Sequence, residues 1–237
     1  MVTLKLLSHG FMSLLTIAGL RKSFPSPDGQ LRIIVEIPEF SLEPGEQIAL
    51  RGESGSGKTT FLHLVAGILA ADRGSIRIGL QDMAALSEAQ RDQLRARSIG
   101  YVFQTFNLLQ GYTCLENVLL GMAFGPGADR QRAAAVLERV GLRHRLDHYP
   151  RQLSTGQQQR VAVARAIAAR PKLILADEPT GNLDRRNARD VLALIRETSR
   201  ETGAALLLVS HDPEVLAAFE RVREFSELNL ARQEAAP

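Results

Sequence analysis

Nine consecutive residues have the composition of a loop that surrounds phosphate groups: Gly52, Glu53, Ser54, Gly55, Ser56, Gly57, Lys58, Thr59 and Thr60. They match G-x-x-x-x-G-K-[ST], a pattern in which glycines let backbone N–H groups close around nucleotide phosphates. Lys58 would place a full positive charge at the β- and γ-phosphates, and the Thr59 hydroxyl would ligate Mg²⁺. A chance match in a chain of this length is on the order of one per cent. The spacing therefore predicts a nucleotide-binding loop.

The acidic pair Asp177–Glu178 is the second candidate for chemistry, and it directly follows the apolar run 173–176. Ionised groups at the end of a buried strand cost free energy unless a cation lies nearby, and a nucleotide-bound Mg²⁺ is such a cation. We expect Asp177 to hold the metal, directly or through water, and Glu178 to accept a proton from the attacking water. The alternative is an acidic turn on the surface.

Two further strands are expected to end in a polar side chain. The run 99–103 ends at Gln104, and the run 204–209 is followed by Ser210-His211-Asp212. Ligands of open α/β sheets bind at the carboxyl ends of the strands, so Gln104 and His211 would meet the acidic pair there. Taken alone, Gln104 is more typical of an ordinary loop.

The phosphate loop needs a strand before it and a helix after it, and the sequence predicts both. Residues 47–50 form a short apolar run, and apolar residues at 61, 64, 65, 68 and 69 recur at helical spacing. The amino end of that helix would point its free amides and partial positive charge at the anion. Further strands are expected at 15–20, 31–37, 74–78 and 172–176, and further helices at 87–96, 117–124, 133–140 and 188–195.

A second stretch could also bind phosphate. In Leu153-Ser154-Thr155-Gly156-Gln157, a serine opens a helix and a glycine follows two residues later. This stretch lies in the segment 105–159, where β signals disappear, so we expect a helical insert. A site on that insert cannot easily serve the same phosphate as Lys58. Phe24, just before a turn at 25–29, could stack on a purine base or belong to the core.

Length and composition fit one large α/β domain. The chain has 237 residues, 45% of them hydrophobic, and no segment has the apolar length of a membrane span; membrane work would require a partner. The net charge of +3 is not concentrated in one block, so we expect no nucleic-acid partner. The single cysteine, Cys114, excludes an internal disulfide and is expected to be a packed apolar side chain.

The amino terminus loosely resembles a secretion signal, but residues 15–20 alternate like a strand. We expect residues 1–13 to be a disordered extension, with Met12 as a possible true start, and a cytoplasmic protein.

Taken in order, these motifs resemble those of ATP-binding-cassette (ABC) transporter ATPases, from about Leu14 to Leu228. Within that superfamily, GESGSGKTTFLHLVAGIL, IGYVFQTFNLL, LENV and LADEPTGNLD are similar to the lipoprotein-release and macrolide-export branch. The resemblance implies an α/β P-loop NTPase (RecA-like) core with a small antiparallel β subdomain and a helical insert. It implies a core of residues 14–104 and 160–228, a helical signature subdomain of residues 105–159, and a tail of residues 229–237.

The resemblance also assigns roles by position. Phe24 would stack on adenine, Gly52 to Thr60 would hold the phosphates of ATP, and Thr59, Gln104 and Asp177 would ligate Mg²⁺. Glu178, His211 and Gln104 would be the catalytic residues, with Glu178 as the carboxylate base and His211 at the γ-phosphate. Ser154, Thr155, Gly156 and Gln157 would bind ATP held by a second copy in a head-to-tail homodimer, and Asp184 would communicate across the interface. Thr155 departs from the family pattern, which most often has glycine there, and its side chain could crowd the loop.

The function that follows is ATP-driven dimer closure, which would power a separate transmembrane permease in export or in lipoprotein or lipid extraction. The subunit would lie at the cytoplasmic face of the inner membrane. Alternatives are a soluble non-transport ABC ATPase and a regulatory nucleotide-binding module. A P-loop GTPase should carry an Asn-Lys-x-Asp motif, which the sequence lacks. The substrate cannot be read from these residues, because the membrane partner selects it.

Overall fold

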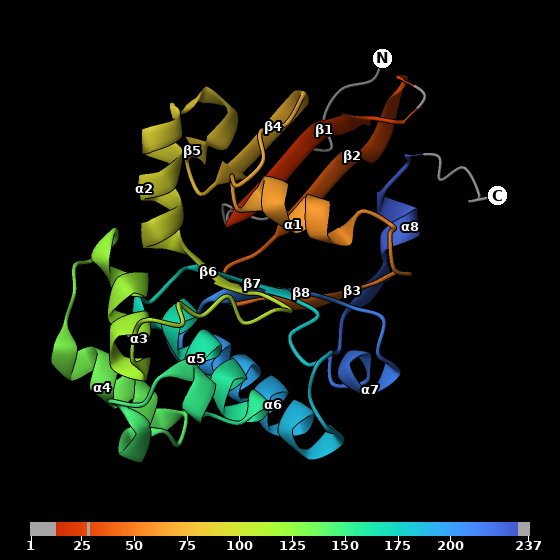
Figure 1. The fold of residues 1–237 in the computed structure, drawn as a ribbon. Coiled ribbons are helices and arrows are strands. Elements are labelled where there is room, and N and C mark those ends of the chain that lie inside the picture. The colour runs from red at the N-terminus through yellow and green to blue at the C-terminus, as the bar shows by residue number, and fades with distance from the viewer. Residues whose placement is uncertain (1–12, 28, 232–237) are drawn as a thin grey trace.

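The structure is a computed structural model that describes residues 13–27 and 29–231. A five-stranded parallel sheet in the order β6-β7-β8-β3-β9 forms its centre (Figure 1). The strands of this sheet are β3 Gln47–Arg51, β6 Ile99–Val102, β7 Leu173–Asp177, β8 Ala205–Ser210 and β9 Val222–Glu224. The phosphate loop follows β3, and Gln104, Asp177 and His211 lie at or just beyond the ends of β6, β7 and β8. Parallel pairing brings these carboxyl ends to one edge of the sheet.

The two central strands are buried on both faces, and alternate side chains belong to different hydrophobic clusters. On β7, Leu173 and Leu175 pack on the face toward α1, whereas Ile174 and Ala176 pack on the opposite face. This matches the two-residue period of a strand and explains why such strands read as unbroken apolar runs. Helices α5 Thr155–Ala168 and α6 Arg185–Thr202 cover the second face (Figure 1).

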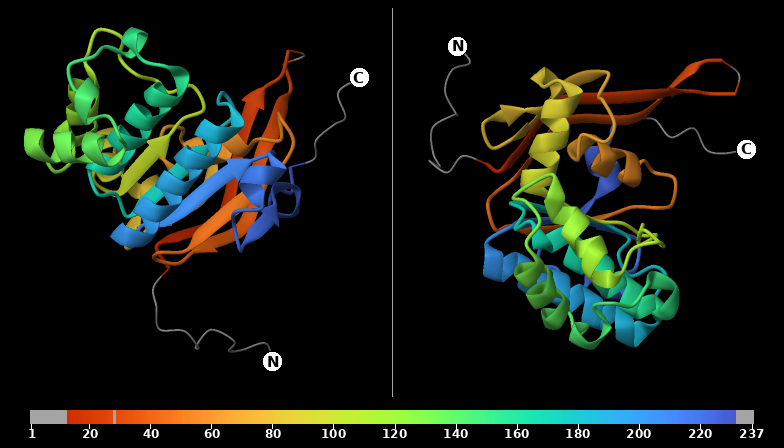
Figure 2. Two further views of the ribbon diagram at one scale, coloured as in Figure 1. Left: turned by 90° about the horizontal axis from the view of Figure 1, so that it is seen from below. Right: turned by 60° about the vertical axis from the view of Figure 1, so that its left-hand side comes forward.

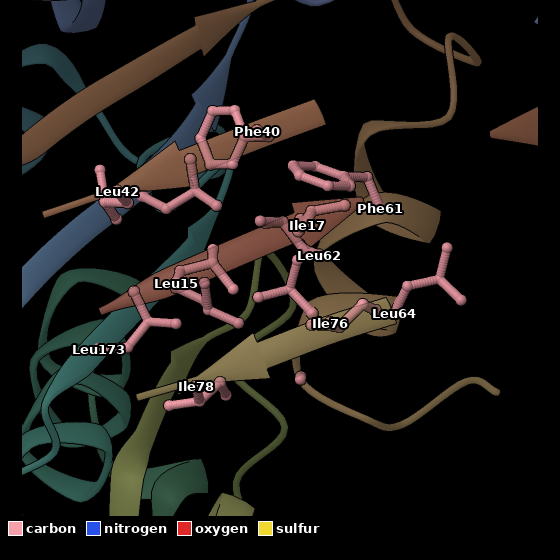
Figure 3. Close-up of a cluster of buried hydrophobic side chains, with 14 of the residues drawn as sticks. Leu15, Ile17, Phe40, Leu42, Phe61, Leu62, Leu64, Ile76, Ile78 and Leu173 are labelled. Carbon is pink, nitrogen blue, oxygen red and sulfur yellow. The ribbon is translucent and has the colours of Figure 1, made fainter. Parts of the chain in front are cut away.

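A smaller antiparallel sheet in the order β2-β1-β4-β5 forms an outer layer, and α1 lies between the two sheets (Figures 1 and 2). Its strands are β1 Leu15–Pro25, β2 Leu31–Leu42, β4 Arg73–Ile78 and β5 Gln81–Asp82. Phe61 of α1, which spans Lys58–Val65, packs edge-to-face against Phe40 with ring centroids 5.9 Å apart. Figure 3 shows both rings among the aliphatic side chains of this cluster. The α1 helix that starts at the phosphate loop is therefore fixed from both sides.

A third cluster lies among the helices of the predicted insert. Helices α3 Cys114–Ala123 and α4 Arg130–Arg139 pack against α5. Cys114 is fully buried, as predicted, and burial raises the pKa of its thiol to about 11. The proposed boundaries at 104/105 and 159/160 stay predictions, and α5 runs across the second of them. The remaining helices are α2 Glu88–Ser98, α7 Pro213–Leu216 and α8 Phe225–Leu228, with single 3₁₀ turns at Met83–Ala85, Arg143–Arg145 and Pro150–Gln152.

Several element ends differ from expectation. The helix after the phosphate loop ends at Val65, and Ile68 and Leu69 lie beyond it because Gly67 turns the chain at φ +67°. Strand β2 continues five residues past the predicted 37, since both its neighbour β1 and the core continue. Helix α3 begins at Cys114 rather than 117, where Thr113 and Glu116 form a capping box.

The predicted disordered extension lies outside the described residues except for Ser13, whose hydroxyl donates to Glu43 at 2.7 Å. Most of the predicted tail lies outside them as well. Within the described ranges, no helix combines the length and hydropathy needed to cross a bilayer.

Candidate active site

The phosphate loop joins β3 to α1 in a conformation that depends on glycine. Gly57 is the residue before α1 and has φ +96°. A Cβ at this position would lie 2.9 Å from the Ile34 carbonyl oxygen of β2. The left-handed backbone and the close approach of β2 together require a residue without a side chain. The first backbone N–H groups of α1 therefore lie at the loop, where they can donate hydrogen bonds to an anion.

Lys58 is buried and folds back over the loop. Its Nζ donates to the carbonyl oxygens of Gly52 and Glu53, both at 2.6 Å. Burial lowers the pKa of the Lys58 ammonium, while the carboxylates of Glu178, Asp177 and Glu53 oppose that shift. Desolvation of this kind makes the ammonium a stronger electrostatic partner for an incoming anion than a surface lysine would be.

Asp177 is the last residue of β7 and is 6% exposed. Burial raises the pKa of its carboxyl group, although a hydrogen bond from Thr59 and the positive charges of His63 and Lys58 oppose the shift. A buried carboxylate beside a threonine hydroxyl has the oxygen chemistry that hard divalent cations prefer. The pair predicted from the sequence to share a metal is thus in contact.

Glu178 follows directly and adopts a left-handed backbone with φ +43°. Its backbone N–H still donates to Val209 of the neighbouring strand at 3.1 Å. The carboxylate lies at the end of β8: Oε2 accepts from the Ser210 hydroxyl at 2.8 Å, and Oε1 accepts from the His211 backbone N–H at 3.1 Å. The His211 ring is also close, with Nδ1 2.7 Å from Oε1.

These side chains border a common hollow. A cavity of about 230 Å³ lies above the phosphate loop. Its lining includes Lys58, Thr59, Gln104, Asp177, Glu178 and His211. The structure therefore brings together the phosphate loop and all three of the predicted polar strand ends. Gln104 is exposed, and its backbone carbonyl accepts from the Asn182 side chain at 2.9 Å.

The Ser154–Gln157 stretch lies elsewhere. None of its residues is among the described residues that line this cavity or the adjoining one beside Gly181 and His211. Ser154 is the N-cap of α5: its hydroxyl accepts from the Gln157 N–H at 3.3 Å, while Gln157 Oε1 accepts from the Ser154 N–H at 3.0 Å. Thr155 is exposed in the first turn.

Gly156 is buried against the beginning of α6 in the same chain. A Cβ on Gly156 would lie 2.7 Å from the Asn187 side-chain oxygen. Asn187 is held by Asp184, whose carboxylate accepts from its backbone N–H at 3.0 Å and from its side-chain amide at 2.5 Å. Backbone and side-chain donors of Asn187 lower the pKa of Asp184. The predicted signature and communication residues are thus neighbours within one chain.

Phe24 is not among the described residues that line the two cavities around the phosphate loop. It is half-buried on β1, opposite Arg32 of β2, and Lys22 Nζ lies 5.5 Å from its ring centroid. Stacking of Phe24 on adenine stays a prediction.

Sequence reasoning missed two buried contacts. Ser210 directly precedes His211 in the sequence, but nothing in its position indicates that its hydroxyl reaches Glu178. Asn229 lies in the predicted tail, yet its amide nitrogen donates to Ile34 O at 2.9 Å and to Ser56 O of the phosphate loop at 3.3 Å. Ser210 is 32 positions from Glu178, and Asn229 is more than 170 positions from both of its partners, so only the fold brings these groups together.

A phosphate loop between a parallel strand and a helix, with carboxylates at the end of another strand of the same sheet, defines a P-loop NTPase. A family profile described as ABC transporter matches residues 35–181. The chain belongs to the ABC transporter family of ATP-binding proteins.

Individual relatives agree with this assignment. The chain is 41% identical over 212 residues to the lipoprotein-releasing system ATP-binding protein LolD of Shewanella sp. (strain MR-4), covering 88% of this chain and 91% of that protein. It is 42% identical over 214 residues to the macrolide export ATP-binding/permease protein MacB of Rhodopirellula baltica, covering 88% of this chain but 31% of that protein.

A solved structure has the same fold. The dimeric post-hydrolysis state of the ATP-binding cassette MJ0796, bound to ADP and Pi, superposes with a TM-score of 0.82 at 33% identity. The match covers 89% of this chain and 93% of the cassette. A second structure of MJ0796, described as a bacterial ABC transporter cassette, is also dimeric and gives a TM-score of 0.81.

Proposed function

We propose that this chain is the ATP-binding and ATP-hydrolysing subunit of an ABC transporter complex, and that it acts as a nucleotide-closed homodimer. The observation that carries the proposal is the buried Glu178 carboxylate, held at the strand end beside a cavity that Lys58, Thr59 and Asp177 also line. The phosphate loop supplies binding, and Glu178 supplies a proton acceptor. A module that only binds nucleotide does not need the second.

In this proposal the loop from Gly52 to Thr60 holds the phosphates of ATP. Its backbone N–H groups and those at the amino end of α1 donate hydrogen bonds to the phosphate oxygens, and Lys58 leaves the carbonyl oxygens of Gly52 and Glu53 to contact the β- and γ-phosphates. The Ser56 hydroxyl is buried without a hydrogen-bond partner among the described residues. A buried orphan hydroxyl in the loop supports a polar ligand there.

Thr59, Gln104 and Asp177 would hold Mg²⁺. Their oxygens fit this ion, which binds through one or two carboxylates together with substrate phosphates and water. When bound, the ion neutralises charge that develops on the phosphates. The raised pKa of Asp177 supports the fit, because a nearby cation would relieve the cost of its buried negative charge.

Glu178 would accept a proton from the water that attacks the γ-phosphorus, and His211 would contact the γ-phosphate. Ring Nδ1 and the backbone N–H of His211 both face Glu178 Oε1. When a phosphate enters, the His211 ring can therefore exchange its contact with Glu178 for a contact with the phosphate. Gln104 lies on the same cavity wall and would help to orient the metal and the water.

The second half of each site would come from a partner copy. The Ser154 N-cap of α5 is exposed and lies apart from the cavity that contains Lys58, so it is available to a phosphate held by another chain. The dimeric state of the MJ0796 cassette supports this arrangement. To move a dimer from 1:99 to 99:1 closed requires about 5.5 kcal/mol. Two shared ATP molecules, each with a hundredfold preference for the closed form, supply about 2.7 kcal/mol apiece.

The names of the LolD and MacB relatives refer to lipoprotein release and macrolide export, which supports a role in export or extraction. We assign the work across the membrane to a separate permease and place this subunit at the cytoplasmic face of the inner membrane.

The test is ATP hydrolysis by the full-length Glu178→Gln variant. We expect it to keep ATP affinity within about threefold and to lose at least 100-fold in kcat, because a positioned base contributes about 10²–10⁴-fold. The exposed Glu197→Gln on α6 is the control and should behave as wild type. Wild-type turnover by Glu178→Gln would refute the catalytic assignment.

A further inference from the structure

Ser210 is the last residue of β8 and is fully buried. Its hydroxyl contacts two groups: it lies 2.8 Å from Glu178 Oε2 and 3.1 Å from the backbone nitrogen of Asp212. A serine hydroxyl has one hydrogen, and a backbone N–H can only donate. The bond from Asp212 therefore fills an acceptor position and leaves the single Ser210 hydrogen for the carboxylate.

The two oxygens of Glu178 have partners of different kinds. Oε2 is bound by Ser210, which is 0% exposed, so no water can replace that hydroxyl. Oε1 is bound by His211, whose side chain is 65% exposed and free to turn. One oxygen is therefore fixed to the sheet, while the other can change its partner.

The backbone of Glu178 makes this anchor necessary. A left-handed residue other than glycine costs roughly 1–2 kcal/mol, and Glu178 has φ +43°. This conformation sends the side chain across to the end of β8, where hydrogen bonds to a charged group can offset the strain. Without Ser210, the only bonds to the carboxylate among the described residues would come from His211.

We propose that Ser210 is a positioning residue for Glu178, which fixes Oε2 so that Oε1 is the oxygen presented to the attacking water. The inference rests on the proposed function, in which Glu178 is the base and His211 contacts the γ-phosphate. When the His211 ring turns to that phosphate, Oε1 keeps the His211 backbone N–H and gains a free lone pair. The water proton passes to Oε1, the water oxygen bonds to the γ-phosphorus, and the bond to the bridging oxygen breaks, so that ADP leaves with that electron pair.

The test compares Ser210→Ala with Ser210→Thr in the full-length chain. Loss of the hydroxyl should lower kcat about 10- to 100-fold, the range expected when a reacting group is misplaced by about 1 Å, and should leave KM for ATP within about twofold. Threonine keeps the hydroxyl and should recover most of kcat; if its methyl group prevents folding, cysteine, a weak donor, should give an intermediate value. Ser199→Ala is the matched control, because Ser199 is also fully buried and its hydroxyl donates to Ala204 O at 2.8 Å, at the amino end of β8 and therefore at the other end of the strand from the site. It should lower stability without changing kcat.

A second measurement separates positioning from folding. The Glu178→Gln/Ser210→Ala double variant should form the same ATP-stabilised dimer as Glu178→Gln alone, since Ser210 acts only through the carboxylate. Failure of that dimer, or a parallel loss of ATP binding in Ser210→Ala, would overturn the inference in favour of a structural role. If Glu178→Gln is inactive but Ser210→Ala has wild-type kcat, only the Ser210 inference is overturned. If Glu178→Gln itself turns over normally, the catalytic assignment and this inference are overturned together.

Discussion

Glu178 illustrates how far a single residue can be interpreted from sequence. An acidic pair after an apolar run predicts a strand-end carboxylate, and the structure places both members of the pair there. Its left-handed backbone and its bond to Ser210 were not predictable. Both depend on the strand order β7-β8, which puts residues 32 positions apart side by side. Local patterns identify the chemistry, whereas sheet topology decides the direction of the side chain.

Asp177 gives a prediction at the residue scale. The Asp177→Asn variant keeps the shape and the acceptor for the Thr59 hydroxyl but removes a buried charge. Because burial holds the pKa of Asp177 above its ordinary value, the ionised carboxylate destabilises the nucleotide-free fold at neutral pH. We expect the melting temperature without nucleotide not to fall, and Mg²⁺-dependent ATP hydrolysis to drop at least 100-fold.

The sign of this effect can be checked by pH. Protonation as pH falls toward the raised pKa removes the penalty in the wild type, so the stability difference between Asp177→Asn and wild type should shrink on acidification. Calorimetry without nucleotide at several pH values measures it. A variant that is markedly less stable than wild type at pH 7 would contradict the account of Asp177.

At the scale of elements, the phosphate loop is held by parts that are distant in sequence. Strand β2 limits Gly57 through the Ile34 carbonyl, and Asn229 bonds to Ile34 and Ser56 at once. Asn229 Oδ1 also accepts from the backbone N–H groups of Glu36 at 2.7 Å and Ala231 at 3.3 Å. Nothing in the local sequence indicated this role, because a lone asparagine near a chain end is typical of a turn.

We predict that Asn229→Ala weakens ATP binding. The substitution leaves buried carbonyl and N–H groups unpaired, at a cost of about 1–3 kcal/mol, and frees the loop to move. The Kd for ATP should rise about 3- to 10-fold and the melting temperature should fall by several degrees, with kcat at saturating ATP within about twofold.

Asn117→Ala is the matched control. Asn117 is also buried, and its side chain pins the backbone of Leu109, Tyr112 and Thr113 with four hydrogen bonds. It should reduce the melting temperature similarly and leave the Kd for ATP unchanged. Equal weakening of ATP binding by both variants would show that Asn229 acts only through overall stability.

Elements themselves were well predicted in kind and less well at their ends. Apolar periodicity indicates each strand of the parallel sheet except the short β9. The helix after the phosphate loop was predicted too long, since Ile68 and Leu69 fit helical spacing while Gly67 ends the turn. Periodicity reports which face is buried, but caps and left-handed glycines decide where an element stops.

The whole molecule contains two features that we propose to bind phosphate, and they do not meet within one chain. The cavity at the phosphate loop and the Ser154 N-cap are separate, and the dimer is the hypothesis that joins them. A Gly156→Ala substitution is a poor test of this dimer contact, because a side chain there would collide with Asn187 of its own chain. Loss of activity in Gly156→Ala would therefore not distinguish a partner contact from misfolding.

Ser154→Asp is a cleaner variant. Aspartate is as good an N-cap as serine, so α5 and the melting temperature should be preserved. Its negative charge would repel a γ-phosphate presented by the partner chain. In the Glu178→Gln background we expect ATP to bind each chain normally but to fail to hold two chains together. Ser154→Asn, which caps without the charge, is the control and should retain more of the dimer. A full-strength ATP-dependent dimer with Ser154→Asp would exclude a phosphate contact at this helix end.

The most direct test of the account is the solution mass of the full-length Glu178→Gln variant by light scattering, with and without saturating Mg-ATP. If ATP closes a homodimer, the mass should be that of a single 26.0-kDa chain without nucleotide and twice that value with Mg-ATP. A mass that stays at 26.0 kDa while a fluorescent analogue shows that every chain holds nucleotide would contradict it.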